Sequence, residues 1–358
     1  MRILWVASRL EGRGGIGRVI AEGARALAAR GHEIHVAGPL ASEDRTPFGD
    51  LPLHAWPRRA GKLARLLGLV PLLRNLRPDV VHFHSATPHG EAIAAARALA
   101  PLVGRPLVVV TPHSSRAAIE RRARLGLRAA HLVIAPSRWA AQRARDAGAH
   151  RVAIVPGGVA IGAAPNLDAR EPVVLVLGRL DAVKGLDVLL DAFAAAAATR
   201  PAWQLWIAGD GPERRALTAH AAALALADRV RFLGFVGGAE KEQVLARAAI
   251  GVLPSRRESF GAALLEMQER GLACVASDVG GIPDLADGGA AARLVPVGEA
   301  GALATALGAL IDDPAARRAL AEAGRRHAER FAWPAIAESY EAEYATVLEV
   351  IAPRAAPR

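Results

Sequence analysis

Short apolar runs alternate with alanine- and leucine-rich stretches along most of this chain. Runs of four to eight apolar residues separated by helical stretches are typical of parallel strands that are covered by helices on both faces. In the first half, the pattern predicts strands at Arg2–Ser8, Glu33–Ala37, Val80–His84, Leu107–Val110 and Leu132–Ala135. A second series begins at Val173–Leu177 and continues through Gln204–Ala208 and Ala249–Ser255. The pattern therefore predicts an α/β protein with two Rossmann-like, doubly wound parallel sheets.

A length of 358 residues is sufficient for two such domains. The stretch from Ala160 to Pro172 is rich in Gly, Ala and Pro and is the predicted linker. We place the first domain at residues 1–165, the second at 166–335, and a C-terminal helix followed by a tail at 336–358.

Two basic residues follow the first strand of the second series, Arg179 and Lys184. In open parallel sheets, ligands bind at the carboxyl ends of the strands. Arg grips phosphate in a bidentate fork, whereas Lys acts as a mobile point charge. The two residues are therefore candidates for holding a diphosphate.

Two glutamates follow the strand-like run Ala249–Ser255: Glu258 in a turn and Glu266 in a helix, roughly two turns deeper. We expect the helix to begin with unpaired N–H groups at Ser259, Phe260 and Gly261, which attract phosphate. The two carboxylates are too far apart to share one proton. Their spacing instead favours contacts with different parts of one extended ligand, which indicates a nucleotide-sugar site.

Several motifs occur in an order that is far more specific than any of them alone. They are Gly14–Arg18, Asp79–Ser85, Thr111–His113, Ala135–Ser137, Val155–Val159, Gly209–Pro212 and the two donor-site stretches above. On these motifs the chain resembles, over nearly its whole length, the retaining glycosyltransferases of the GT-B fold, family 4 (glycosyl transferases group 1). That resemblance implies two domains that face each other across a cleft, and a final helix that crosses back toward the first domain.

The resemblance also implies roles for individual residues. Arg179 and Lys184 would bind the donor diphosphate, Glu266 the ribose hydroxyls and Glu258 hydroxyls of the transferred sugar. His113 would face that sugar. Arg179, Lys184, Glu258 and His113 are the expected catalytic residues.

Residues near the start of the chain would complete the site. Gly15 would approach the diphosphate, and Gly14, Gly15, Arg18 and His84 would contact the acceptor. The chain departs from the family pattern at Gly157, where Asn is usual, and at Ala273, where Pro is usual.

The implied reaction transfers a hexosyl unit from a UDP- or GDP-linked sugar to a glycan or lipid-linked acceptor of the cell envelope. It retains the anomeric configuration by front-face attack, needs no cofactor, and needs no metal because cationic side chains neutralise the diphosphate. Two alternatives stay open: a sugar-nucleotide epimerase of the same architecture, and a nonenzymatic protein that binds anionic lipid.

Charge is uneven along the chain: residues 1–170 carry 25 Lys and Arg against 11 Asp and Glu, and residues 171–358 carry 20 against 24. Residues 58–74 mix cations with leucines, which favours either contact with an anionic membrane or an ordinary helix with a solvated face. Neither a membrane-spanning run nor a signal peptide is evident, so the protein is expected in the cytoplasm, peripheral at the inner face of the membrane. The single cysteine, Cys274, is expected to be a core thiol.

Three weaker patterns point elsewhere. Gly12, Gly14 and Gly17 have dinucleotide-binding spacing, but no acidic residue ends the next strand to hold a ribose. His82 and His84 alternate like metal ligands, but no further ligands follow at suitable spacing, so we expect no metal site. With only 15 aromatic residues and no base-stacking pattern, nucleic acid is not an expected partner.

Overall fold

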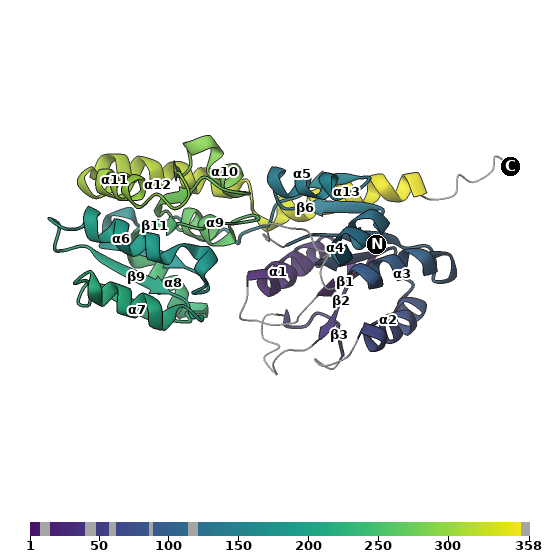
Figure 1. Cartoon of the computed structure of the whole chain (residues 1–358). Coiled ribbons are helices and arrows are strands. Elements are labelled where there is room, and N and C mark those ends of the chain that lie inside the picture. The colour runs from purple at the N-terminus through teal and green to yellow at the C-terminus, as the bar shows by residue number, and fades with distance from the viewer. Residues whose placement is uncertain (8–14, 40–47, 57–61, 86–88, 114–120, 352–358) are drawn as a thin grey trace. The chain divides into compact units, whose positions relative to one another are not determined.

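The computed structural model describes residues 1–7, 15–39, 48–56, 62–85, 89–113 and 121–351 of the chain (Figure 1). The chain forms two compact units. Unit 1 consists of Met1–Gly158 together with Trp333–Arg358, and unit 2 consists of Val159–Ala332. Each unit is a parallel sheet with helices on both faces, as the apolar pattern predicts.

The sheet of unit 1 has seven strands in the order β3-β2-β1-β4-β5-β6-β7, and every neighbouring pair is parallel. The direction of winding reverses between β1 and β4, which makes this point the topological switch of the sheet. The strands are β1 Arg2–Ala7, β2 Glu33–Pro39, β3 Leu53–Trp56, β4 Val80–His84, β5 Leu107–Val110, β6 Leu132–Ala135 and β7 Val152–Ile154.

Successive side chains of β1 enter different layers of unit 1. Ile3 and Trp5 pack with α1 and α13, whereas Leu4 and Val6 pack with α2, α3 and α4. This alternation follows from the two-residue repeat of a strand. The helices are α1 Gly15–Ala29, α2 Lys62–Leu76, α3 Gly90–Leu99, α4 Arg121–Ala129, α5 Arg138–Asp146 and α13 Trp333–Ile351.

A buried polar chain joins α13 to the centre of this sheet. The indole N–H of Trp5 donates to the hydroxyl oxygen of Tyr344 at 3.3 Å, and that oxygen lies 2.6 Å from Nδ1 of His82. Nε2 of His82 lies 2.8 Å from the hydroxyl of Thr111. Because a buried polar group without a partner is costly, this chain explains how His82 tolerates a fully buried position.

The sheet of unit 2 has six parallel strands in the order β10-β9-β8-β11-β12-β13, with its switch between β8 and β11. The strands are β8 Glu171–Leu177, β9 Gln204–Ala208, β10 Val230–Gly234, β11 Ala248–Leu253, β12 Ala273–Ser277 and β13 Arg293–Val295. Cys274 is buried in β12, as expected, and burial raises the pKa of its thiol.

Helices cover both faces of this sheet too. Val174 and Val176 of β8 pack with α6, α7 and α11, while Val173, Leu175 and Leu177 pack with α8, α9 and α10. The helices are α6 Leu186–Ala196, α7 Arg214–Ala223, α8 Gly238–Arg247, α9 Ala262–Glu269, α10 Ile282–Leu285, α11 Ala300–Asp312 and α12 Pro314–Glu329. Short 3-10 turns lie between some elements, among them η4 at Ala182–Lys184.

The proposed interfacial segment, residues 58–74, lies partly within α2. Leu69 and Leu73 of this helix are buried in the core of unit 1, so this part of the segment packs against that core. Among the described residues, no helix combines the length and the apolarity that crossing a membrane requires.

Candidate functional site

The predicted donor residues gather at the switch point of the second sheet. Arg179 and Lys184 follow β8, and Glu258 follows β11, the strand on the other side of the switch. Lys184 ends the short turn η4, and its Nζ donates to Oε2 of Glu258 at 2.6 Å. The pair is mostly buried, with side chains 25% and 15% exposed. A charged pair therefore stands where a parallel sheet binds ligands.

Arg179 is presented differently. Its side chain is 69% exposed, and its Nε lies 2.8 Å from Oδ2 of Asp181. Arg179 and Lys184 line one small hollow together with Gly178 and Pro254, among others. Since surface ion pairs are weak, the bond to Asp181 holds Arg179 only loosely, and the guanidinium can turn to an incoming anion.

The turn after β11 differs from the predicted one. α9 begins at Ala262, not at Ser259, because Gly261 takes a left-handed conformation with φ of 101° and serves as the N-cap. The backbone N–H of Ser259 donates to Oε1 of Glu258 at 3.3 Å. Ser259 and Phe260 thus precede the helix, and the prediction that they supply its free N–H groups was wrong. Gly261 occupies the N-cap position, where the first of these groups belongs. Glu266 consequently lies about one turn into α9, not two.

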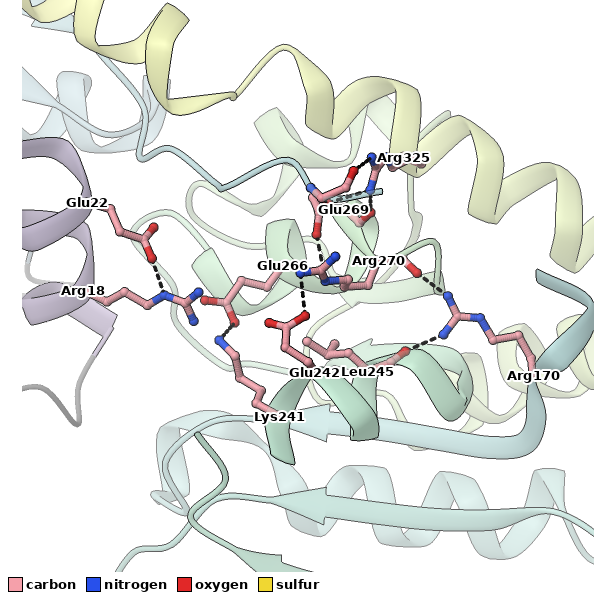
Figure 2. Close-up of polar contacts among 11 residues, drawn as sticks. Arg18, Glu22, Arg170, Lys241, Glu242, Leu245, Glu266, Glu269, Arg270 and Arg325 are labelled. Carbon is pink, nitrogen blue, oxygen red and sulfur yellow. Dashed lines mark hydrogen bonds and ion pairs between the residues drawn. The ribbon is translucent and has the colours of Figure 1, made fainter. Parts of the chain in front are cut away.

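Glu266 has a partner that the sequence did not reveal. Nζ of Lys241 in α8 donates to Oε2 of Glu266 at 2.9 Å (Figure 2). An alternative explanation for the two glutamates is pairing with the nearby arginines Arg256, Arg257 or Arg270. Instead, Arg256 bonds Asp187, and Arg270 pairs with Glu242 and Glu269.

Glycines allow the connections around the switch point to touch backbone to backbone. A Cβ on Gly280, where φ is +62°, would lie 1.8 Å from the carbonyl oxygen of Glu258. A Cβ on Gly185, where φ is +64°, would lie 2.2 Å from the carbonyl oxygen of Pro254. Side chains at these two positions are excluded both by the space and by the backbone conformation.

The corresponding edge of unit 1 carries two of the predicted histidines. His84 is the last residue of β4 and His113 follows β5; Nδ1 of His84 lies 3.3 Å from Nε2 of His113, and the rings are stacked. Burial lowers the pKa of His113 from its ordinary value of 6.5 to about 4. Burial, followed by the charges of His82 and His113, lowers the pKa of His84 well below its ordinary value. These histidines are therefore neutral near pH 7.

Of the remaining predicted residues, Gly15 and Arg18 lie at the start of α1. Gly14 lies outside the described residues, and Gly15 is the first residue of the helix. Nε of Arg18 donates to Oε1 of Glu22 one turn further along, at 2.7 Å (Figure 2).

The predicted linker is tied to the rest of unit 2 by hydrogen bonds of Gly162 and Arg170. Glu269, only 2% exposed, accepts from the N–H of Gly162 at 2.8 Å and from Arg325 at 2.6 Å (Figure 2). Arg170 donates to the carbonyl oxygens of Leu245 and Arg270, and burial lowers its pKa to about 10. These contacts give Arg170, Glu269 and Arg325 a structural role apart from the site.

Among the described residues, no group of three or more His, Cys, Asp or Glu side chains is arranged to hold a metal ion. His82 instead bonds Tyr344 and Thr111.

Two family models match the chain. The model described as Glycosyltransferase Family 4 matches residues 13–162, and the model described as Glycosyl transferases group 1 matches residues 161–327. The chain belongs to this family of glycosyltransferases, as the motifs indicate.

Individual relatives match over shorter stretches. The D-inositol 3-phosphate glycosyltransferase of Segniliparus rotundus is 31% identical over 225 residues, which are 58% of this chain and 50% of that protein. The alpha-D-kanosaminyltransferase of Streptomyces kanamyceticus is 36% identical over 157 residues, 44% of this chain and 40% of that protein. The chain thus spans about half the length of the curated relatives it matches.

Solved structures match over nearly the whole chain. Sucrose-phosphate synthase from Thermosynechococcus elongatus superposes with a TM-score of 0.82 at 23% identity, covering 98% of this chain and 100% of that chain. Anabaena Alr3699/HepE in complex with UDP also has a TM-score of 0.82, at 21% identity, covering 97% and 100%. These similarities confirm the GT-B fold.

Substitution of Gly280 tests the importance of its close contact with Glu258, and Gly288 supplies the control position. Gly280→Ala should lower the thermal stability of unit 2 and weaken nucleotide binding, because the new methyl displaces the carbonyl of Glu258. Gly288 has nearly the same φ, +64°, but open space around its Cα, so Gly288→Ala should cost only about 1 kcal/mol of backbone strain. Calorimetric unfolding and binding measurements on both variants test this; equal effects would contradict it.

The lowered pKa values of the buried histidines predict how stability depends on pH. Below about pH 6.5 these histidines become protonated in the unfolded chain, whereas in the folded chain they stay neutral to lower pH. The free energy of unfolding should therefore fall as the pH drops from 6.5 toward 4. His113→Asn should make this slope shallower by up to about 1.4 kcal/mol per pH unit. The exposed His150 supplies the control variant, His150→Asn. Melting curves across this range would refute the idea if His113→Asn left the slope unchanged.

Proposed function

We propose that this protein transfers a hexosyl unit from a nucleoside-diphosphate sugar to a glycan or lipid-linked acceptor, with retention of the anomeric configuration. The observation that carries the proposal is the pairing of Lys184 with Glu258 at the switch point of the second sheet, beside the exposed Arg179. Membership of the glycosyltransferase family supports the reaction class.

The diphosphate would be held by Arg179 and Lys184. An ammonium group has three donors, so Lys184 can bond a phosphate oxygen while it keeps its bond to Glu258. Arg179 offers a planar fork that matches two phosphate oxygens. Both charges then stabilise the negative charge that develops on the leaving diphosphate, and no divalent metal is needed for that task.

Glu258 would accept hydrogen bonds from hydroxyls of the transferred sugar. Its contact with Lys184 fixes one carboxylate oxygen relative to the phosphate-binding cation. The sugar and the leaving group are thus held by two adjacent side chains, which aligns the anomeric carbon for attack. Glu266 would hold the ribose.

The bond-making step needs no protein nucleophile in this scheme. The acceptor hydroxyl attacks the anomeric carbon on the face that the diphosphate leaves, and the departing phosphate oxygen takes the hydroxyl proton. We assign His113 to the sugar during this step, as a neutral hydrogen-bonding group, since burial holds its pKa at about 4. Gly14, Gly15, Arg18 and His84 are assigned to the acceptor.

The names of relatives suggest the first substrates to try. One of the solved structures with this fold is described as a complex with UDP-glucose, and a relative from Mycobacterium leprae is named as a phosphatidyl-myo-inositol mannosyltransferase. UDP-glucose and GDP-mannose are therefore the first donors to test. The acceptor would be an envelope glycan or a lipid-linked precursor, in the cytoplasm or at the inner face of the membrane.

Binding of UDP, GDP and ADP in the presence of EDTA tests the donor site. One nucleotide should bind saturably, and Lys184→Ala should weaken it at least about tenfold by removing a charge-assisted hydrogen bond. Arg200→Ala, which breaks an ion pair with Asp312 elsewhere in unit 2, is the control. Equal affinity in Lys184→Ala and the parent protein would refute the site. With the matching donor, an epimerised sugar in place of a new glycoside would favour the epimerase alternative.

Contact with anionic lipid is proposed for α4 in preference to α2. Arg121, Arg124, Leu125 and Arg128 share one exposed face of α4, whereas Leu69 and Leu73 of α2 are buried. Arginines beside an exposed leucine suit an anionic membrane surface.

Sedimentation with phosphatidylglycerol vesicles tests this surface. The double variant Arg121→Gln with Arg124→Gln should lose about 2 kcal/mol of vesicle binding, at about 1 kcal/mol per charge. Phosphatidylcholine vesicles serve as the control. Binding that does not change in the double variant would refute the role of α4.

A further inference from the structure

Lys241 and Glu266 are drawn together from two helices of unit 2. Lys241 lies in the first turn of α8, Glu266 lies in α9, and the two side chains point toward each other (Figure 2). Nζ of Lys241 is 2.9 Å from Oε2 of Glu266, and the side chains are only 13% and 24% exposed. Both groups have therefore lost much of their hydration, unlike an ordinary surface pair.

The position of Lys241 is unfavourable for its own helix. The amino end of an α-helix carries a partial positive charge, so the first turn favours Asp and Glu over Lys. Glu240, one residue earlier, follows that preference. A lysine that opposes the dipole is not explained by the stability of α8, and departures of this kind concentrate at functional positions.

Joining the two helices does not explain Lys241 either. The next residue, Glu242, pairs with Arg270 at 2.5 Å, and this pair already connects α8 to the end of α9 (Figure 2). Val244 and Leu245 of α8 and Leu264 and Leu265 of α9 also lie in one apolar cluster. What Lys241 adds is a fixed cation on the carboxylate of Glu266.

We propose that Lys241 is a positioning residue for recognition of the donor ribose. The inference rests on the proposed function, in which Glu266 binds the ribose hydroxyls. A carboxylate has about four acceptor sites, so an oxygen held by Lys241 leaves capacity for hydroxyl donors. The ammonium fixes the rotamer of Glu266 and keeps its carboxylate aimed at the ribose before the nucleotide arrives. Binding then requires less ordering of this side chain.

A positioning role for Lys241 can be distinguished by experiment from a general attraction between its charge and phosphate. Loss of a positive charge near the diphosphate would weaken all nucleotides equally, whether or not they have a 2′-hydroxyl. Loss of a residue that positions the ribose-binding carboxylate weakens ribonucleotides and leaves 2′-deoxyribonucleotides little affected. The ratio of the two affinities therefore reports on positioning and not on fold or charge.

The experiment compares UDP with 2′-deoxy-UDP by calorimetry on the full chain. The parent protein should favour UDP by about 10- to 100-fold, the value of one hydrogen bond to a charged group. Lys241→Met should bind UDP about tenfold more weakly and 2′-deoxy-UDP almost as the parent does, so the ratio shrinks. Lys241→Arg should recover part of it. Glu242→Gln, which breaks the neighbouring pair between the same helices, should keep the parent ratio.

Each outcome decides between the possibilities. If Lys241→Met keeps the parent protein's ratio of UDP affinity to 2′-deoxy-UDP affinity, or weakens both nucleotides equally, the positioning role is overturned while the donor site stays in place. The guanine and adenine pairs, GDP with 2′-deoxy-GDP and ADP with 2′-deoxy-ADP, are measured in parallel. A parent protein that binds none of the three ribonucleotides overturns the proposed function and this inference together. Melting curves confirm that each variant is folded.

Discussion

Direct contact between backbones at the carboxyl edge of the second sheet is the constraint on which the candidate donor site depends. A Cβ on Gly209 would lie 1.8 Å from the carbonyl oxygen of Gly178, and a Cβ on Gly211 would lie 2.4 Å from that of Leu180. Together with the contacts at Gly185 and Gly280, these close approaches bring the connections after β8, β9, β11 and β12 against one another. Lys184 and Glu258, 74 positions apart in sequence, meet at 2.6 Å as a result. The glycines at these close contacts thus allow the charged residues Lys184 and Glu258 to come together.

The apolar pattern predicts most of the strands that lie between two neighbouring strands and are buried on both faces of the sheet. Apart from β12, the strands that the predicted series leave out are β3, β7, β10 and β13, which are the edge strands of the two sheets. Their residues are less buried: Val152–Ile154 of β7 has no buried side chain, and β10 has one. A strand with one neighbour does not need a continuous apolar run, so its signal resembles that of a loop.

The candidate site could be predicted in position but not in its contacts. Arg179, Lys184 and Glu258 are recognisable because they follow strands, and strand ends gather at one edge of a parallel sheet. The delayed start of α9 depends on the left-handed backbone of Gly261, which composition does not show. Lys241 was missed because its partner lies 25 positions away on another helix, and only the packing of α8 against α9 brings them together. Side-chain partners of this kind follow from tertiary structure, not from sequence spacing.

Unit 1 is assembled from both ends of the chain, and this has a consequence for its synthesis. The hydroxyl of Tyr344 receives the indole N–H of Trp5, which precedes it by 339 positions. During translation, β1 and β4 leave the ribosome long before α13, so the first sheet waits with Trp5 and His82 lacking their partner. Unit 2 is continuous in sequence and is complete before α13 emerges. Although domains near the amino terminus generally fold first during synthesis, here the second unit can finish folding before the first.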